Sequence, residues 1–544
     1  MDIQFGEDLM RSTPKFPKTG KIGLKLSAAL MVAITAVGLG ANPTSASVPY
    51  ASDSAAPAST AAGHGDLSKP RTVVTTDMEQ DDLASLIRYM FYTNDLDTQG
   101  IIYTSGRFHF AGDGKGTLFF LPGREYKTPQ TSWRWTGTTT IEHDVLKAYA
   151  RVYPNLKKQD QAYPSPADLL SKVKIGNIDF EGEMDHDTAG SNLIKKLLLD
   201  NDTRPLYLQA WGGTNTIARA LKSIADQYSK SPRWADIKAK VTTKAVVLAS
   251  GFQDETYTNY ISVNWPLIKV EQLSAGYATW GYNCNRGSGN TRGLPNDGKY
   301  FQGAWIKANI QIGPLGSLYR SWLDGQAMRG DQLDIFGDPA LAKTGWCPPL
   351  NKYDFLSEGD DVAYLPLLNT GIENPANPLL GGWGGRATQT STYPNLWTMV
   401  PTELGADRTA VSNYTTARWE AAVQNDFAAR VQWSLTPRYR SANHAPTVAI
   451  RSGGNVNVVA GQEARLRGIA TDPDDDRVAV KWWQYAEEGT YPGSVTFRRD
   501  TSSSTTVVVP ADARPGQSIS VIFQGTDNGK FPLTRYARVT LHVV

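Results

Sequence analysis

The chain has few cysteines and few histidines for its length. Cys284 and Cys347 are the only cysteines among 544 residues, and the six histidines are scattered along the sequence. Two cysteines can form at most one disulfide, and the sequence does not show whether they meet. Neither residue type occurs at the spacing of a zinc site, so a zinc-stapled fold and a small disulfide scaffold are both excluded.

The chain also lacks an excess of charge of either sign. Lysine and arginine number 55 against 53 acidic residues, which leaves a net charge of +2, and charged residues make up only 20% of the chain. A protein that binds nucleic acid concentrates positive charge on one face, and this composition indicates no such field. We therefore expect no nucleic-acid polymer among the partners.

No apolar run near the N-terminus is long enough to span a membrane. The run over residues 26–40 is shorter than the ~20 residues that a membrane-spanning helix needs. It follows a basic segment, residues 15–25, and precedes the small residues 44–46. This layout predicts that residues 1–46 are a secretory signal peptide, with an uncleaved anchor as the alternative. Residues 47–70 are rich in Ala, Ser and Pro and predict a linker, so we expect a secreted, extracellular protein without a membrane partner.

The most informative stretch of the chain is a strand, a loop and a helix. Residues 72–76 are β-branched and predict a buried strand, and apolar residues at helical spacing begin at Leu83. The loop between them lies at the carboxyl edge of a parallel sheet, where open α/β sheets bind ligands. It carries four acids within six residues: Asp77, Glu79, Asp81 and Asp82. Hard oxygen ligands favour calcium or magnesium, and the alternative is a solvated helix start.

The pattern Asp77-x-x-x-Asp81-Asp82 resembles the aspartate motif of nucleoside hydrolases. That motif usually begins with another Asp two residues earlier, where this chain has Thr75. The resemblance implies that Asp77 and Asp82 hold Ca²⁺ and that Asp81 works at the hydroxyl groups of a sugar. The whole pattern most resembles a secreted nucleoside-hydrolase-like family, some of whose members are described as cellulose-binding proteins.

Two later stretches are similar to other parts of the same family. Residues 204–218 predict a strand, a Gly-Gly turn and a helix that opens with Thr-Asn. By this resemblance the carbonyl group of Ala210 is a metal ligand, whereas the alternative is an ordinary turn between strand and helix. Asp360 stands where the family has its last metal ligand. Gly359 stands where the family has a histidine that assists departure of the base, and Glu358 offers a second acid or ligand nearby.

The expected sugar contacts depart from the family pattern. Arg107 follows a Gly turn where nucleoside hydrolases have an Asn that touches the sugar. An arginine cannot accept a hydrogen bond, so it indicates either a different, anionic group in the substrate or a surface residue on a turn. Asn259 and Asn264, in a loop similar to the family's next ligand loop, are further candidate substrate contacts. Residues 108–160 show little periodicity and predict an inserted loop region that could roof a pocket.

The pattern of apolar and polar residues changes at residues 444–446. About seven short alternating stretches follow, separated by turn residues, and they predict an immunoglobulin-like β-sandwich. Trp482 and Trp483 are adjacent, so one faces inward and the other outward, where it could stack on a sugar ring or lie at the rim. The acidic run 472–476 could bind calcium, as in cadherin-like sandwiches, or form a solvated turn.

These observations predict two domains after the linker. Residues 71–435 are expected to form a nucleoside-hydrolase-like α/β domain with a mostly parallel sheet flanked by helices, and residues 445–544 the sandwich. We expect a Ca²⁺-dependent hydrolase of N-glycosidic or related glycosyl bonds, in which Asp77 and Asp81 are catalytic. Its partner would be a sugar-containing small molecule or a polysaccharide. The alternatives are a non-catalytic polysaccharide-binding (cellulose-binding) protein that keeps the metal site, and a surface adhesion module.

Overall fold

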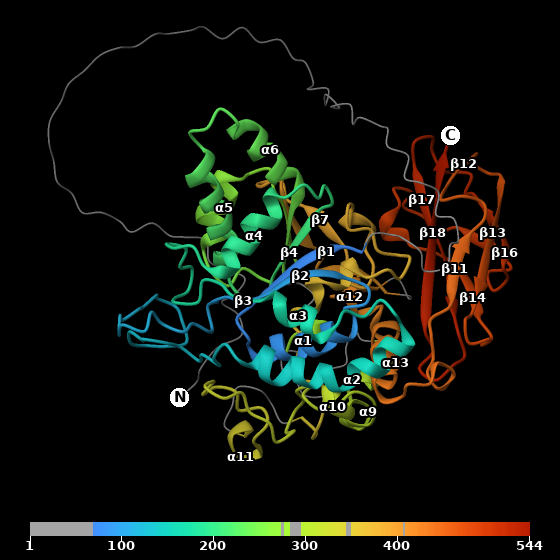
Figure 1. Cartoon of the computed structure of the whole chain (residues 1–544). Helices are drawn as coiled ribbons and strands as arrows, with labels where there is room; N and C mark the ends of the chain where they lie inside the picture. The colour runs from blue at the N-terminus through green and yellow to red at the C-terminus, as the bar shows by residue number, and fades with distance from the viewer. Residues whose placement is uncertain (1–68, 274–276, 283–294, 344–349, 406–408) are drawn as a thin grey trace, which may run out of the picture. The chain divides into compact units, whose positions relative to one another are not determined.

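Residues 69–544 are described by the computed structural model, apart from residues 274–276, 283–294, 344–349 and 406–408 (Figure 1). The expected signal peptide, most of the expected linker, Cys284 and Cys347 lie outside the described residues, so the prediction of a signal peptide and the pairing of the cysteines stay untested.

The first part of the chain is built on one eight-stranded sheet with the order β3-β2-β1-β4-β5-β6-β8-β7. Strand β1 pairs in parallel with β2 and β4, and every one of its residues is buried. All other neighbouring pairs are parallel except β7 with β8. The strands are β1 (Arg71–Thr76), β2 (Asp97–Tyr103), β3 (Val173–Ile175), β4 (Leu206–Ala210), β5 (Ala245–Ala249), β6 (Lys269–Gln272), β7 (Ala387–Gln389) and β8 (Leu396–Met399).

Helices cover both faces of this sheet, because successive side chains of a strand point to opposite faces. Val74 packs in one apolar cluster with Leu86 and Met90 of α1, and Val73 packs in another with Ile217 of α5. Figure 1 shows α4, α5 and α6 on one side of the strands and α1, α2 and α13 on the other. The long helices are α1 (Gln80–Phe91), α2 (Leu146–Gln159), α4 (Ala189–Leu199), α5 (Asn215–Tyr228), α6 (Trp234–Lys244) and α13 (Glu420–Leu435). No helix in the described part of the chain is both long and apolar enough to cross a membrane.

Shorter elements connect the main ones. They comprise a two-stranded sheet, short α-helices and two π-helical turns: β9 (Thr402–Leu404), β10 (Ala410–Ser412), α3 (Pro166–Lys172), α7 (Ser262–Asn264), α8 (Tyr277–Trp280), α9 (Gly303–Asn309), α10 (Gly313–Gly316), α11 (Pro339–Ala342), α12 (Tyr414–Ala417), η2 (Ile141–Val145) and η3 (Tyr257–Ile261).

The prediction of an irregular segment over residues 108–160 is wrong for its last part. Residues 141–159 form η2 and α2, and α2 buries Tyr149, Val152 and Leu156 at helical spacing. Pro154, inside this helix, masks the pattern because proline usually interrupts helices. The earlier part of the segment does cover the aspartate loop, since the hydroxyl of Thr136 donates to the carbonyl of Met78 at 3.3 Å.

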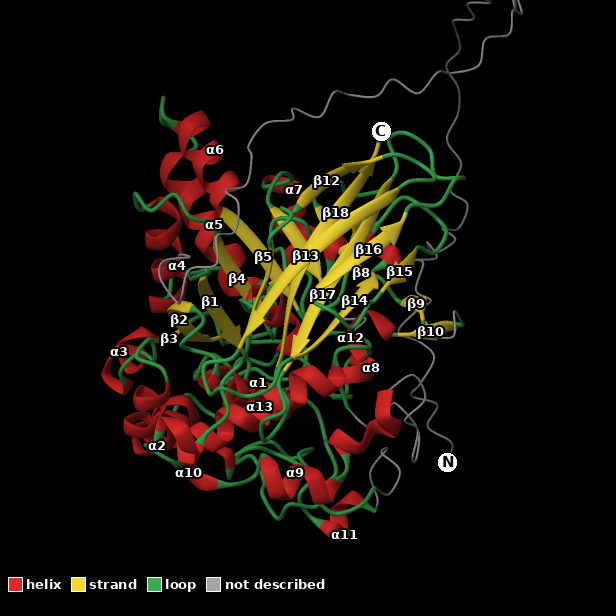
Figure 2. Cartoon of the chain, turned by 90° about the vertical axis from the view of Figure 1, so that its right-hand side faces the viewer, coloured by secondary structure: helices red, strands yellow, loops and turns green. Residues whose placement is uncertain are grey.

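The last hundred residues form an all-β sandwich, as expected. Its two four-stranded sheets have the orders β11-β13-β16-β15 and β12-β18-β17-β14, and Figure 2 shows their strands in yellow. Leu466, Trp482 and Phe523 belong to the apolar cluster of this sandwich. The strands are β11 (Thr447–Ile450), β12 (Asn455–Val458), β13 (Glu463–Thr471), β14 (Ala479–Gln484), β15 (Thr496–Arg498), β16 (Ser504–Val508), β17 (Ser518–Thr526) and β18 (Thr534–Val543).

Side chains of the sandwich also join the core of the first part. Tyr485 and Tyr536 belong to the same apolar cluster as Trp419 and Phe427. The guanidinium of Arg535 lies 2.8 Å from the carboxylate of Asp426 in α13. The predicted boundaries therefore separate two sets of strands that share part of one core.

Candidate functional site

The aspartate loop folds as a three-residue connection between β1 and α1. Strand β1 ends at Thr76, Glu79 occupies the N-cap position of α1, and Met78 between them has the left-handed φ of +55°. The hydroxyl of Thr76 accepts the backbone N–H of Met78 at 3.0 Å and donates to Asp82 at 2.5 Å. The sharp turn therefore directs Asp77 away from the strand and holds Asp82 beside the strand end.

Four aspartates meet at this edge of the sheet. Asp77, Asp81 and Asp82 come from the loop and the first turn of α1. Asp360 comes from a turn almost 280 residues later. This turn lies next to α1, since the backbone N–H of Asp360 donates to the hydroxyl of Ser85 at 3.3 Å. Burial raises the pKa of Asp360 well above its usual range, and the charges of Asp82, Asp81 and Asp77 raise it further. The exposed fractions of Asp77, Asp81, Asp82 and Asp360 are 0%, 8%, 1% and 3%.

Several oxygens of this cluster have no hydrogen-bond donor among the described residues. Both carboxylate oxygens of Asp77 are buried without a donor, and so are Oδ2 of Asp82 and Oδ2 of Asp360. An ionised carboxylate can only accept hydrogen bonds, so buried carboxylates without donors must either take up protons or face a cation. A divalent cation that prefers oxygen ligands would satisfy such acceptors.

The pKa values of these aspartates also indicate that they must take up protons or face a cation. Burial and the charge of Asp82 raise the pKa of Asp81 to about 7. Burial raises that of Asp82 to about 7, and burial with the neighbouring acids raises that of Asp77 well above its usual range. Without a cation, four buried carboxylates cannot all be ionised at neutral pH.

Glycines let the backbone approach Asp77 closely. A Cβ atom on Gly106 would overlap Oδ2 of Asp77, and one on Gly212 would lie 2.8 Å from Cγ of the same residue. Gly106 follows β2, and Gly212 follows β4, the two strands that flank β1. The Gly turns seen in the sequence are therefore walls of the aspartate site.

Gln253 is a site residue that the sequence analysis missed. A Cβ atom on Gly106 would overlap Oε1 of Gln253 as well as Asp77, so both oxygens face the same space. Oε1 of Gln253 is buried without a donor, while its Nε2 donates to the carbonyl of Trp211 at 3.2 Å. The one signal in the sequence was its position four residues after β5, at the same edge of the sheet.

The carbonyl of Ala210 lies in the ladder between β4 and β5. It accepts the backbone N–H of Ser250 at 3.1 Å and the Ser250 hydroxyl at 3.3 Å. The same hydroxyl lies 2.6 Å from Oδ1 of Asp360. Ser250 thus connects the two proposed ligands, and Ala210 stays a proposed ligand.

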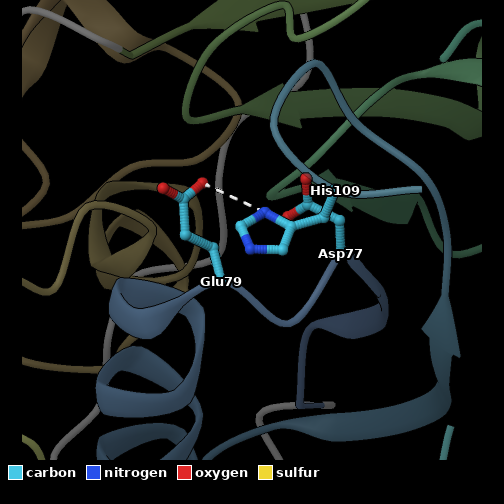
Figure 3. Close-up of side chains that lie close together, drawn as sticks. All are labelled: Asp77, Glu79 and His109. Carbon is cyan, nitrogen blue, oxygen red and sulfur yellow. Dashed lines mark ion pairs between the residues drawn. The ribbon is translucent and has the colours of Figure 1, made fainter. Parts of the chain in front are cut away.

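His109 is a second residue that the sequence analysis missed (Figure 3). It follows β2, and its ring lies between the carboxylates of Asp77 and Glu79, with Nδ1 at 3.8 Å from Oε2 of Glu79. Ligand atoms of these three residues lie within 4.8 Å of one another, and the same holds for Glu79, Asp81 and Asp82. Nε2 of His109 faces Asp331 at 3.4 Å. Burial lowers the pKa of His109 to about 4, so the ring is neutral at pH 7.

The remaining predicted substrate residues do not join the aspartates through any hydrogen bond or ion pair in the described structure. Glu358 is fully buried, pairs with Arg88 at 2.5 and 2.9 Å and accepts the hydroxyl of Tyr319. Arg107 donates to the carbonyl of Gly123. Asn259 and Asn264 are exposed on η3 and α7.

The two tryptophans of β14 divide as the alternation predicts. Trp482 is 1% exposed and lies in the sandwich core. Trp483 is half-buried and lies 6.1 Å from Trp419, between ring centroids, with Arg418 over its ring. Its outward face is thus covered by the first part of the chain, which favours the rim interpretation over an open platform for a sugar.

Comparisons with known proteins point in one direction. Residues 71–387 match the family model for the cellulose-binding Sde182 nucleoside hydrolase-like domain, and residues 465–543 match that for the C-terminal domain of the cellulose-binding protein Sde0182. No curated protein matches the chain.

Among solved structures, one similar protein is a nucleoside hydrolase-related hypothetical protein from Saccharophagus degradans that is associated with carbohydrate metabolism. It is 25% identical with a TM-score of 0.64, over 88% of this chain and 100% of that one. A plant nucleoside hydrolase, PpNRh1, is 7% identical with a TM-score of 0.28, over 66% of this chain and 98% of that one.

Proposed function

The chain belongs to the cellulose-binding Sde182 family with its nucleoside hydrolase-like domain, and on this premise we propose that it is a secreted, Ca²⁺-dependent hydrolase of N-glycosidic or related glycosyl bonds. The observation that carries the proposal is the meeting of Asp77, Asp81, Asp82 and Asp360 with buried oxygens that lack donors. A site kept only for packing would pair these carboxylates with arginine, as the chain does for Glu358 and Arg88.

The proposed ligands of the cation are Asp77, Asp82, Asp360 and the carbonyl of Ala210, with Oε1 of Gln253 as an additional neutral oxygen. Calcium takes six to eight oxygens in a flexible arrangement, whereas magnesium keeps several waters. Among the described residues named for this site, five buried side-chain oxygens have no donor: two of Asp77 and one each of Asp82, Asp360 and Gln253. This supply of protein oxygens favours calcium. When bound, the cation supplies a Lewis acid that makes a water molecule a better nucleophile.

The roles of the chain's own residues follow from their positions. Asp77 lies deepest, with both oxygens free of donors, and would accept the proton of the attacking water. Asp81 is the most exposed of the four and would accept hydrogen bonds from the hydroxyls of a ribose-like ring. The collected negative charge would stabilise the oxocarbenium-like transition state of glycosyl transfer.

A second candidate function is a non-catalytic polysaccharide-binding protein that keeps the metal site. The observation that favours it is that, among the described residues of this site, no histidine is available to protonate a leaving group. Gly359 replaces the histidine expected from the family, and His109 has a pKa of about 4 and a fully buried ring. The family's description as cellulose-binding agrees with this candidate.

The two candidates separate with substrates that differ in their need for leaving-group protonation. The purified chain is incubated with Ca²⁺ and one of two substrates, inosine or p-nitrophenyl riboside. Of the two, only p-nitrophenyl riboside has a leaving group that departs without a proton. Release of p-nitrophenol that is lost in Asp77→Asn and kept in Asp113→Asn, a partly exposed loop residue, supports hydrolysis. No release from either substrate, together with Ca²⁺-dependent retention on cellulose, supports the binding protein.

A further inference from the structure

A second group of buried oxygens without donors lies in the sandwich, far along the chain from the aspartate loop. It is formed by the turn between β13 and β14, the turn between β17 and β18, and the segment that leads from α13 into β11. Asn443, Asp472 and Asp527 each contribute one such oxygen, and Oδ2 of Asp476 lies beside that of Asn443. No residue assigned to the first site belongs to this group.

Asn443 and Asp527 form the buried floor of the group. Asn443 is 8% exposed and Asp527 is 4% exposed. Nδ2 of Asn443 donates to Oδ1 of Asp527 at 3.1 Å and to the carbonyl of Phe531, which defines the orientation of the amide. Oδ1 of Asn443 and Oδ2 of Asp527 are then buried acceptors that no donor of the described residues reaches.

Asp472 and Asp476 close the group from the β13–β14 turn. Oδ1 of Asp472 accepts the backbone N–H groups of Asp474 and Asp476 at 2.8 and 3.2 Å, while its Oδ2 is buried without a donor. A Cβ atom on Gly529 would lie 2.5 Å from Oδ2 of Asp476 and would overlap Oδ1 of Asn443. These two oxygens therefore point at one space beside the backbone of Gly529.

In the part of the chain that the structure describes, no positive side chain pairs with these carboxylates. Among the described residues, no lysine or arginine forms an ion pair with Asp472, Asp476 or Asp527, and the ring of His444 pairs with Asp474 instead. Burial raises the pKa of Asp527, and the charge of Asp472 raises it further. Buried acceptors from three segments without donors are the arrangement that a hard cation resolves.

We propose that Asn443, Asp472, Asp476 and Asp527 form a second divalent-cation site, of the calcium class, at the base of the sandwich. The site ties the segment before β11 to two turns of the sandwich. The carbonyl of Asn443 accepts the indole N–H of Trp433 in α13 at 2.8 Å, so the cation also holds the end of the first part of the chain. Its role is to order the connection over residues 436–446.

The test uses calcium alone and the full chain with the Asp82→Ala substitution, which removes the first site. Calorimetry should still detect Ca²⁺ binding in this variant. Adding Asp472→Asn, which keeps an acceptor for the turn, should weaken that binding at least tenfold. Asp475→Asn is the matched control, because Asp475 belongs to the same turn and is exposed. Equal affinity of the two double variants, or no binding to Asp82→Ala, overturns the proposal.

A second measurement follows the connection itself. Arg438 and Arg440 are exposed in it and are sites for trypsin. In the Asp82→Ala background, Ca²⁺ should slow cleavage at these arginines at least fivefold, and Asp472→Asn should abolish this protection. Should Asp82→Ala fail to fold, the otherwise unchanged chain is compared with and without Asp472→Asn, which should lower the number of bound Ca²⁺ by one; an unchanged number overturns the proposal.

Discussion

Gly359 and Asp81 are in contact, so that a Cβ atom on Gly359 would overlap Oδ2 of Asp81. Asp81 also accepts the hydroxyl of Ser357 at 3.3 Å and is almost buried, so its carboxylate has little room to move. The absence of a histidine at position 359 is therefore more than the loss of a proton donor. The carboxylate of Asp81 takes the space that any side chain at this position would need.

We predict that Gly359→Ala lowers the affinity of the site for sugar at least tenfold, because the methyl group displaces Asp81. Gly359→His should be no more active than the unchanged chain. The control is Gly251→Ala, since a Cβ atom at Gly251 meets open space. Ribose binding by calorimetry is the measurement, and equal affinities of the two alanine variants would contradict the placement of Asp81.

Asp82→Ala should abolish Ca²⁺ binding at the first site while the chain still folds. Asp82 combines an oxygen held by Thr76 with an oxygen that has no donor, so its loss removes a ligand and leaves the strand end intact. Calcium calorimetry on this variant and on Asp113→Ala, a control in a partly exposed loop, checks the assignment. If Asp82→Ala bound Ca²⁺ at the first site as tightly as the unchanged chain, the ligands of that site would lie elsewhere.

The thermal stability of the chain should fall as the pH rises in the absence of calcium, and calcium should offset this fall. Asp81 and Asp82 have folded pKa values of about 7, above the ordinary value near 4 of an unfolded aspartate. Groups of this kind favour the folded state while they are protonated, and that stability is lost as the pH rises through about 7. With a chelator, the Tm should fall between pH 5 and pH 8. With Ca²⁺ in excess, the gain in Tm should grow over the same range, because calcium competes with protons.

The matched variant for this experiment is Asp82→Asn, which cannot titrate. Its Tm in chelator should fall less steeply with pH than that of the unchanged chain. A Tm that is the same with and without calcium at pH 8 would contradict the assignment of a Ca²⁺ site to these aspartates.

Arg535→Ala should destabilise the whole chain by about 2 kcal/mol, because it leaves one oxygen of the buried Asp426 without its partner in the sandwich. Arg514→Ala, at an exposed position of the sandwich, is the control and should change little. Chemical denaturation measures both. Equal stabilities would indicate that the sandwich adds nothing to the first part.

The same contacts bear on the predicted boundaries. Each part has apolar residues of its own, so residues 71–435 and 445–544 are still expected to fold separately. Because Tyr485 and Tyr536 leave the shared cluster on separation, the first fragment should melt below the full chain. A fragment with an unchanged Tm would show that this cluster contributes no stability.

Much of the fold follows from local patterns in the sequence. The strand before Asp77, the helix after Asp82 and the alternating strands of the sandwich are set by the spacing of apolar residues along short stretches. The close spacing of acids in the loop between that strand and helix likewise indicates a site from the sequence alone. Helix α2 was not predicted from the sequence, because Pro154 interrupts its otherwise regular apolar pattern.

The composition of the site depends on contacts between segments far apart in the chain, and only the tertiary structure decides these. Gln253 and His109 reach Asp77 because β5 and β2 end at the same edge of the sheet, and neither residue belongs to a sequence motif. Glu358 stands beside Asp360 in sequence, yet Arg88, 270 residues earlier, pairs with it in the core. Sequence spacing determines which face of an element a side chain occupies, whereas the packing of elements determines whether that side chain meets a cation, a substrate or a buried arginine.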